Sequence, residues 1–259
     1  MYKKILIYLK IFLFFIFFNN IALSSETNLL KQEWSFKGLT GKFDRSSLQR
    51  GYQVYNEVCS SCHSMNLLSY RNLGEEGGPE FSVQQVKAMA ANFEVTDGPN
   101  NDGEMFTRPG RPSDKFVSPY PNVQAAMAAN GGAYPPDMSV LVKARKGGAD
   151  YIYSILMGYE EAPQDFELEE GVHYNKYMDG NKIKMANPLS DDLITYADGT
   201  NSTISQMSKD VTTFLTWAAE PHLESRHKMG LKVIIYLIIL TVLIYFSMKT
   251  LWLRIDSKK

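Results

Sequence analysis

The chain has 259 residues, of which 44% are hydrophobic and 21% are charged, and its 27 Lys and Arg against 28 Asp and Glu give a net charge of −1. This composition excludes a disordered or collagen-like chain, and two cysteines exclude a fold held by many disulfides. The length fits one domain with appendages. Because the net charge is an average, the charges are counted below by segment.

The first 24 residues are typical of a secretory signal peptide. Three lysines precede the apolar run IFLFFIFF at 11–18, and Ala22-Leu23-Ser24 provides a small-x-small cleavage site. The alternative is a membrane helix that stays in place, but the apolar run is short and ends in two asparagines. We therefore predict that residues 1–24 are a cleaved signal peptide and that residues 25–225 form an exported, periplasmic domain.

Both cysteines lie in the pentapeptide Cys59-Ser60-Ser61-Cys62-His63. C-x-x-C-H is the signature of covalent c-type haem attachment, in which the two thiols add to the vinyl groups and the imidazole becomes an axial iron ligand. The alternatives are a zinc half-site, which lacks a third cysteine, a thioredoxin-like pair, which lacks a βαβ setting, and a simple disulfide, which gives the histidine no role. The motif therefore predicts one haem c held by Cys59, Cys62 and His63.

The segment before the motif has the periodicity of an amphipathic helix. Apolar and cysteine side chains recur every three or four positions, at Leu48, Tyr52, Tyr55, Cys59 and Cys62. We expect one helix that runs into the motif and presses this face on the haem edge. Beyond it, residues 92–122 are rich in Gly and Pro and predict a long irregular stretch that wraps a cofactor.

A methionine thioether is the second axial ligand that suits an electron-transfer haem, because it gives a six-coordinate iron and raises the reduction potential. An open iron position would instead suit oxygen or peroxide chemistry. Most of the 12 methionines are expected to fill the core. Met138, Met178 and Met185 lie near loop-forming residues, and spacing alone leaves the three equal.

Two further helices are predicted, over about 140–158 and about 202–220. The second has an apolar stripe at helical spacing, made by Ile204, Met207, Val211, Phe214, Leu215 and Ala218. Pro221 should end or bend this helix.

Between these helices, residues 160–170 contain six acidic side chains and no basic one. They are Glu160, Glu161, Asp165, Glu167, Glu169 and Glu170. A solvated loop is the alternative for such a run. However, residues 25–225 as a whole contain 17 basic and 27 acidic residues, a net charge of −10. A field of this sign repels nucleic acid and attracts a basic protein, so we predict that the run is a docking patch for a basic partner.

The C-terminal part carries an apolar run, LKVIIYLIILTVLIYFSM at 231–248, which is long enough to cross a bilayer. A buried core helix is the alternative, but a domain of this size needs no helix that is apolar on every face. We predict a transmembrane anchor over 229–250 and a short cytoplasmic tail over 251–259. The basic residues after the run favour this orientation, although Arg226, Lys228 and Lys232 at its other end weaken the charge argument. The signal peptide independently predicts the same orientation.

Segments along nearly the whole mature chain resemble, in order, the cytochrome c1 family, the haem subunits of the ubiquinol–cytochrome c reductase (cytochrome bc1) complex. They are RGYQVY at 50–55, VCSSCHSM at 58–65, RPG at 108–110, PYPN at 119–122, ANGGA at 129–133, PPD at 135–137, ARKGG at 144–148, WAAEP at 217–221 and KMGLK at 228–232. The resemblance implies a mainly α, class I-like c-type cytochrome domain with long haem-wrapping loops and one C-terminal transmembrane helix.

The resemblance also implies roles for single residues. Met185 matches the family's axial methionine, although Met178 remains a competitor because the residues around it depart from the family pattern. Arg145 matches an arginine that pairs with a haem propionate, with an exposed surface charge as its alternative. Four residues match positions that line the haem pocket, with ordinary packing as their alternative: Tyr55, Asn130, Pro136 and Tyr151.

The implied function is one-electron transfer from a Rieske iron–sulfur protein to a soluble or membrane-anchored cytochrome c, in a dimeric inner-membrane complex with cytochrome b. Enzyme activity then belongs to the ubiquinol:cytochrome c oxidoreductase as a whole. One alternative is a free-standing, membrane-anchored cytochrome that delivers electrons to a terminal oxidase. Another is a haem enzyme or gas sensor with an open iron site.

Overall fold

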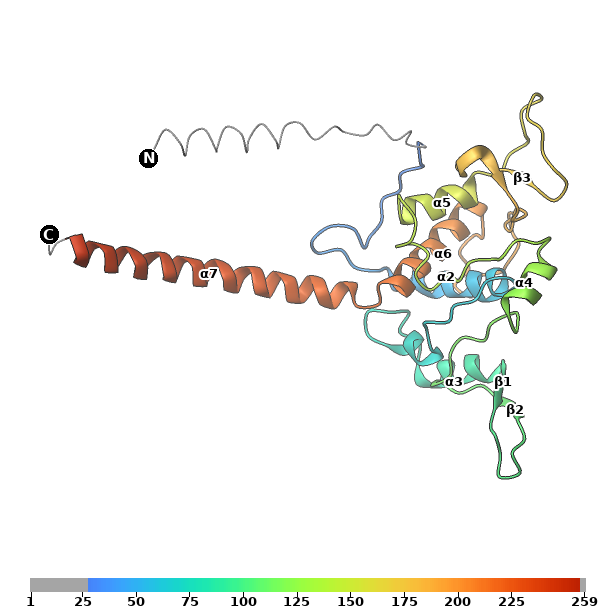
Figure 1. Cartoon of the computed structure of the whole chain (residues 1–259), viewed down its shortest axis with the longest axis horizontal. Helices are drawn as coiled ribbons and strands as arrows, with labels where there is room; N and C mark the ends of the chain where they lie inside the picture. The colour runs from blue at the N-terminus through green and yellow to red at the C-terminus, as the bar shows by residue number, and fades with distance from the viewer. Residues whose placement is uncertain (1–27, 257–259) are drawn as a thin grey trace.

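The computed structural model describes residues 28–256, in which a helical domain carries one long projecting helix (Figure 1). The helices are α2 (Arg45–Glu57), α3 (Val83–Ala91), α4 (Val123–Ala129), α5 (Ala149–Met157), α6 (Ile204–Ala219) and α7 (Leu223–Asp256). Long loops and two small hairpins connect them. The predicted fold class is confirmed. The predicted signal peptide lies outside the described residues.

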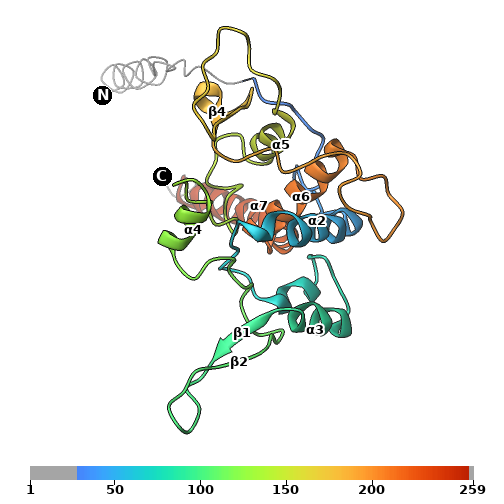
Figure 2. The same ribbon diagram turned by 90° about the vertical axis from the view of Figure 1, so that its right-hand side faces the viewer.

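Helices α2 and α6 pack against each other at the centre of the domain (Figure 2). Gly51 permits their close approach, because a Cβ atom at this position would lie 2.1 Å from the carbonyl oxygen of Asp210. Beside it, the buried Asp210 carboxylate accepts hydrogen bonds from Arg50 Nε at 2.8 Å and Nη2 at 3.2 Å. The predicted apolar stripe of α6 faces this contact, with Phe214 fully buried against Tyr52. The helix pair therefore forms the core on which the loops are arranged.

The segment that precedes α2 crosses α5 and is held there by one buried carboxylate. Asp150 accepts hydrogen bonds from Trp34 Nε1 at 2.6 Å and from Lys37 Nζ at 3.1 Å. One turn on, Ser154 Oγ accepts a hydrogen bond from the backbone N–H of Leu30 at 2.9 Å. These bonds attach residues 30–37 to the domain, although they are more than 110 positions away from α5 in the chain.

Residues 92–122 were expected to be irregular throughout, and this prediction is wrong in part. Strands β1 (Glu94–Asp97) and β2 (Phe106–Pro109) form an antiparallel hairpin, with Glu94 opposite Pro109 and Asp97 opposite Phe106, that projects from the domain (Figure 2). Arg108 stabilises its base, since it donates to Asp97 at 2.5 Å and to Asp114 at 2.6 Å. The Gly and Pro residues that suggested irregular structure form its turn and flanks.

The helix predicted over 140–158 is shorter than expected. Helix α5 begins at Ala149, and residues 139–147 form successive turns. Gly147 and Gly148 both have positive φ angles, of 93° and 57°. Two consecutive residues in this conformation cannot continue a right-handed helix, so the helix starts after them.

The end of the domain follows the prediction closely. Helix α6 ends at Ala219, and α7 begins at Leu223, two residues after Pro221. Helix α7 is long and apolar enough to cross a membrane, with a mean hydropathy of 2.4 over its most apolar window, and it extends away from the domain (Figure 1). Its apolar side chains are exposed along the projecting part. A helix apolar on all faces and packed on nothing is suited to a lipid environment.

Candidate functional site

The two cysteines lie at the ends of a tight turn that follows α2. Cys59 begins the 3₁₀ turn η1 (Cys59–Ser61), Cys62 caps it, and the backbone N–H of His63 donates to the Cys59 carbonyl oxygen at 2.9 Å. The predicted helix runs up to the motif, but the two cysteines do not belong to it, because α2 ends at Glu57. The hydroxyls of Ser60 and Ser61 bond to backbone carbonyls of the last turn, which favours the tighter turn over a longer helix.

Both cysteines are free thiols of intermediate burial. Burial raises the pKa of the Cys59 thiol to about 12, so this thiol is protonated at neutral pH. The pair thus provides two free thiols in the turn that follows the central helix.

His63 is held from two sides. Its Nδ1 atom lies 2.9 Å from the carbonyl oxygen of Pro136, and because a carbonyl can only accept, Nδ1 carries the proton. Burial lowers the pKa of His63, which outweighs the opposing effect of the Pro136 carbonyl, so the ring is neutral at neutral pH. Tyr55, which is buried, donates from its hydroxyl to the His63 carbonyl oxygen at 3.3 Å. Nε2 has no hydrogen-bond partner in residues 28–256 and is free to bind a metal.

One carboxylate joins the His63 segment to the Pro136 segment. Asp137 accepts hydrogen bonds from Ser64 Oγ at 2.9 Å, from the Asn66 N–H at 2.8 Å and from the Ser139 N–H at 2.9 Å. In addition, the Met138 N–H donates to the Ser64 carbonyl oxygen at 2.8 Å. These bonds fix the position of the carbonyl that orients the imidazole.

Cys62 opens onto a pocket of about 180 Å³ that is lined mainly by residues 118–123 and by Tyr134 and Pro135. The Tyr120 hydroxyl lies 4.0 Å from Cys62 Sγ and accepts a hydrogen bond from Asn130 Nδ2 at 3.2 Å. Asn130 is thus placed at the pocket beside the cysteine. A larger pocket of about 500 Å³ lies between α2 and α3. Of the residues predicted to face the haem, only Tyr52 of α2 borders this pocket.

Met185 lies in the loop that follows strand β4 (Lys182–Ile183), which pairs with β3 (His173–Tyr174). Two contacts hold this loop. Tyr159 donates from its hydroxyl to the Met185 carbonyl oxygen at 3.0 Å, and Lys184 Nζ donates to the Gly131 carbonyl oxygen at 3.3 Å. The second contact joins the Met185 loop to the residue next to Asn130, so the structure connects the methionine loop with the pocket beside Cys62.

The other two candidate methionines are engaged elsewhere. Met138 is buried in the core, and its backbone belongs to the segment that holds His63. The Met178 sulfur accepts a hydrogen bond from the Tyr151 hydroxyl at 3.5 Å. These contacts favour Met185 over both of them as a free thioether.

The remaining predicted residues are placed as follows. Tyr151 projects from α5 toward Met178, as described above. Arg145 is exposed in the turn before α5, where its Nη1 donates to the carbonyl oxygen of the preceding residue, Ala144, at 3.3 Å. All six acidic residues of 160–170 are exposed in the loop between α5 and β3. Phe166 attaches this loop to the hairpin, because its ring packs edge-on against Tyr174 with ring centroids 5.1 Å apart.

Residues that the sequence reasoning missed hold the site together: Tyr120, Asp137, Tyr159 and Lys184. The repeated prolines around Tyr120 were a signal, because they indicate a fixed loop conformation. Nothing in the local sequence indicates the long-range partners of Tyr159 or Lys184.

This donor set fits a covalently bound haem. It combines two free thiols at C-x-x-C spacing, a neutral imidazole with a free Nε2, and a thioether loop joined to the same pocket. A helical domain with these features defines the chain as a c-type cytochrome carried on an apolar helix.

Comparisons with known proteins define the family. The model of the Cytochrome C1 family matches residues 34–255. The chain is 47% identical over 226 residues to Cytochrome c1-2, heme protein, mitochondrial, from Solanum tuberosum, covering 87% of this chain and 86% of that protein. It is 46% identical over 241 residues to Cytochrome c1 of Rhodospirillum rubrum, covering 87% and 88%. The chain therefore belongs to the cytochrome c1 family, whose members carry a covalently bound haem c.

A further relative has a different length. The chain is 51% identical over 239 residues to Cytochrome b/c1 of Bradyrhizobium diazoefficiens, covering 85% of this chain but only 35% of that protein. The name of that relative refers to both cytochrome b and cytochrome c1. The family assignment confirms the resemblance predicted from the ordered sequence segments, in bacterial and in mitochondrial forms.

Proposed function

We propose that this chain is the electron-transfer subunit of a cytochrome bc1 complex, which accepts one electron at a time from a Rieske iron–sulfur protein and passes it to a cytochrome c. The observation that carries the proposal is the Cys59-Cys62-His63 turn, with its imidazole oriented by the Pro136 carbonyl. Family membership supports the place in the complex.

A haem bound at this site would supply a reversible one-electron iron couple. The thiols of Cys59 and Cys62 would hold it covalently, and His63 Nε2 and the Met185 sulfur would bind its iron. The hydrogen bond from His63 Nδ1 to Pro136 fixes the ring orientation before the metal binds. Tyr55, Asn130, Pro136 and Tyr151 are proposed to line the haem pocket. Tyr55 donates to the His63 carbonyl oxygen, and Asn130 donates to Tyr120 beside Cys62.

Arg145 is proposed to pair with a haem propionate. Its guanidinium is exposed and always charged, and its forked donors match a carboxylate. The pairing neutralises the negative charge of the propionate at the haem edge. The reduced iron is therefore favoured more than it would be beside an unpaired propionate.

The acidic loop of 160–170 is proposed to dock a basic cytochrome c. Its six carboxylates are exposed, and the loop packs on the β3–β4 hairpin that leads to Met185. A docked partner would therefore lie close to the proposed iron ligand. Attraction between the opposite charges would raise the association rate more than the final affinity.

The membrane arrangement completes the proposal. Residues 1–24 are cleaved, 25–225 form the periplasmic haem domain, 229–250 cross the inner membrane, and 251–259 lie in the cytoplasm. Support comes from α7, which is apolar on all faces. Cytochrome b contacts are expected along this helix, and the complex is expected to be a dimer.

Purification in mild detergent tests the proposal. We expect this chain to copurify with a cytochrome b and a Rieske protein, to carry haem that survives denaturation, and to be reduced when ubiquinol is added to the complex. A chain that purifies alone and reduces a terminal oxidase directly would replace the proposal with a free-standing cytochrome. Carbon monoxide binding to the reduced protein would indicate an open iron site instead.

A further inference from the structure

The first turn of α7 is bound to the haem domain by a buried carboxylate. Glu224 is only 7% exposed. Its Oε1 accepts hydrogen bonds from the Phe43 N–H at 2.9 Å and from Arg45 Nη1 at 2.7 Å, and its Oε2 accepts one from Arg45 Nη2 at 3.0 Å. The two oxygens therefore meet a forked guanidinium and a backbone donor at once, from a segment about 180 positions earlier in the chain.

Arg45 is itself fixed by other parts of the domain. Its Nε donates to Glu80 Oε1 at 2.8 Å, and its Nη1 also donates to the Phe43 carbonyl oxygen at 3.0 Å. Glu80 Oε1 in turn accepts the Gly77 N–H at 2.9 Å. The guanidinium thus connects the start of α2, the loop before α3 and the start of α7.

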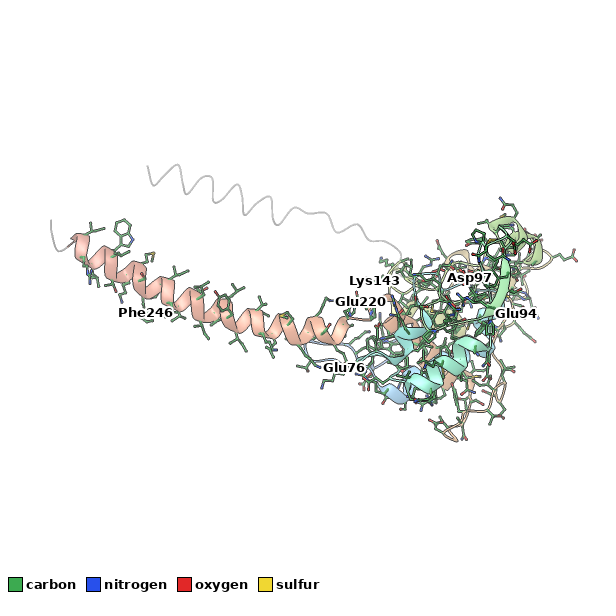
Figure 3. All side chains as sticks on the ribbon, turned by 90° about the horizontal axis from the view of Figure 1, so that it is seen from below. Glu76, Glu94, Asp97, Lys143, Glu220 and Phe246 are labelled. Carbon is green, nitrogen blue, oxygen red and sulfur yellow. The ribbon has the colours of Figure 1, made fainter. Side chains whose placement is uncertain are left out.

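A second carboxylate lies on the other side of the break at Pro221. Glu220 forms ion pairs with Lys143 at 2.5 Å and with Arg226. Lys143 belongs to the turns between the His63-orienting segment and α5. On α7, one turn after Glu224, His227 Nδ1 lies 3.2 Å from the Gly41 carbonyl oxygen. Figure 3 labels Glu220, Lys143 and Glu76 around the domain end of α7.

These contacts lie where the chain would otherwise bend freely. Pro221 interrupts the backbone hydrogen bonds between α6 and α7, and within residues 28–256 no other segment packs on the projecting part of α7. The bidentate pair is directional, and removal of Arg45 leaves the buried Glu224 carboxylate without its guanidinium partner, whereas removal of Glu224 leaves Arg45 paired only with Glu80. The ion pairs therefore restrict the direction of α7 at a natural hinge.

We propose that Glu224 and Arg45 are positioning residues that lock the direction of the anchor helix relative to the haem domain. The lock holds the electron-transfer site at one height and tilt above the membrane. This consequence for electron transfer rests on the proposed function, whereas the lock itself does not.

Distance measurement between two spin labels tests the lock directly. Nitroxides are attached at Lys87→Cys, exposed on α3, and at Leu237→Cys on α7, in the full-length, haem-loaded protein in lipid nanodiscs. The unmodified junction should give a single narrow distance peak. Glu224→Ala and Arg45→Ala should each lose this peak and give a broad distribution, and the double variant should be no broader than either single one, because the two residues act as one pair.

The matched control is Lys228→Gln, which lies on the same helix and breaks a pair with Glu76 at 3.6 Å whose side chains are both exposed. Its distance peak should stay narrow, since exposed pairs contribute little. If the alanine variants do not fold, Arg45→Lys replaces them in the test. This variant keeps the charge but loses the forked donors, and it should broaden the distance peak. A narrow peak in every folded Arg45 and Glu224 variant would overturn the proposal. Failure of ubiquinol to reduce the haem would contradict the proposed function without changing the distances.

Discussion

His63 Nδ1 donates a hydrogen bond to the carbonyl oxygen of Pro136 at 2.9 Å, although 73 positions separate the two residues. The acceptor is a backbone atom, so its position depends on how the segment around it is held. Asp137 supplies that support through its bonds to Ser64, Asn66 and Ser139. The orientation of the imidazole therefore depends on a carboxylate that does not touch it.

Asp137→Ala should destabilise the haem domain by about 1–3 kcal/mol, because buried donors lose their acceptor. Denaturant unfolding of the purified protein measures this effect. A haem spectrum recorded at the same time should show weaker histidine ligation well before global unfolding. Asp165→Ala, in the exposed loop, is the control and should change neither quantity. Equal unfolding midpoints for Asp137→Ala and the unmodified protein would contradict the role of Asp137.

Replacement of the cysteines should remove the covalent bonds one at a time. Cys59→Ala and Cys62→Ala should each keep one thioether, whereas the double variant should release its haem when the protein is denatured. Mass spectrometry of the denatured chain gives the answer, since only a covalent haem adds to its mass. Ser60→Ala, within the same turn, should keep both bonds. Haem retained by the denatured double variant would show that the attachment lies elsewhere.

Met185→Leu should lower the reduction potential by on the order of 100 mV or more, because a thioether ligand raises the potential of a histidine-ligated haem. The same variant should lose the sulfur-to-iron absorption band. Met178→Leu is matched in size and chemistry, and it should leave both properties unchanged because the Met178 sulfur is bonded to Tyr151. The reverse pattern would move the axial ligand to Met178.

Neutralisation of the acidic loop should slow electron transfer to a basic cytochrome c. The double variant Glu167→Gln with Glu170→Gln should reduce the second-order rate about two- to tenfold at low salt and make it less sensitive to ionic strength. Stopped-flow kinetics over a range of salt concentrations measures both. Asp102→Asn with Glu104→Gln changes the net charge equally on the β1–β2 hairpin and should have a smaller effect. Identical rates for the two double variants would contradict a local docking site.

Asp150 should make the domain sensitive to acid. Burial alone would raise the pKa of this carboxyl, but the hydrogen bonds from Trp34 and Lys37 outweigh it and hold the pKa below the usual value of 3.8. A carboxyl group whose pKa is lowered by folding stabilises the folded state at pH values above its ordinary pKa. This contribution to the free energy of unfolding is lost as the pH falls through the folded-state pKa.

The free energy of unfolding of Asp150→Asn should accordingly be about 1–3 kcal/mol below that of the unmodified protein at pH 7. The difference should begin to shrink as the pH falls below about 4, and the two proteins should converge once the pH lies below the folded-state pKa of Asp150. Trp34 fluorescence follows the attachment of residues 30–37 in the same titration. A constant difference at all pH values would show that charge is not the cause.

Much of the site was predictable because it is encoded locally. The C-x-x-C-H motif is contiguous, the α6 stripe has a clear period, and Pro221 marks the break before α7. The β1–β2 hairpin was missed because its glycines and prolines indicate a turn equally well in an irregular loop. The contacts of Tyr159 with Met185 and of Lys184 with Gly131 depend on distant chain segments, which periodicity does not reveal.

The central pair of helices also sets an order of events during synthesis. Arg50 and Asp210 are 160 positions apart, so α2 does not meet its main partner helix, α6, until the ribosome has nearly finished the chain. The haem-attachment turn, which follows α2 directly, emerges long before that. Its two thiols are therefore synthesised before α6 can pack on α2 and complete the core.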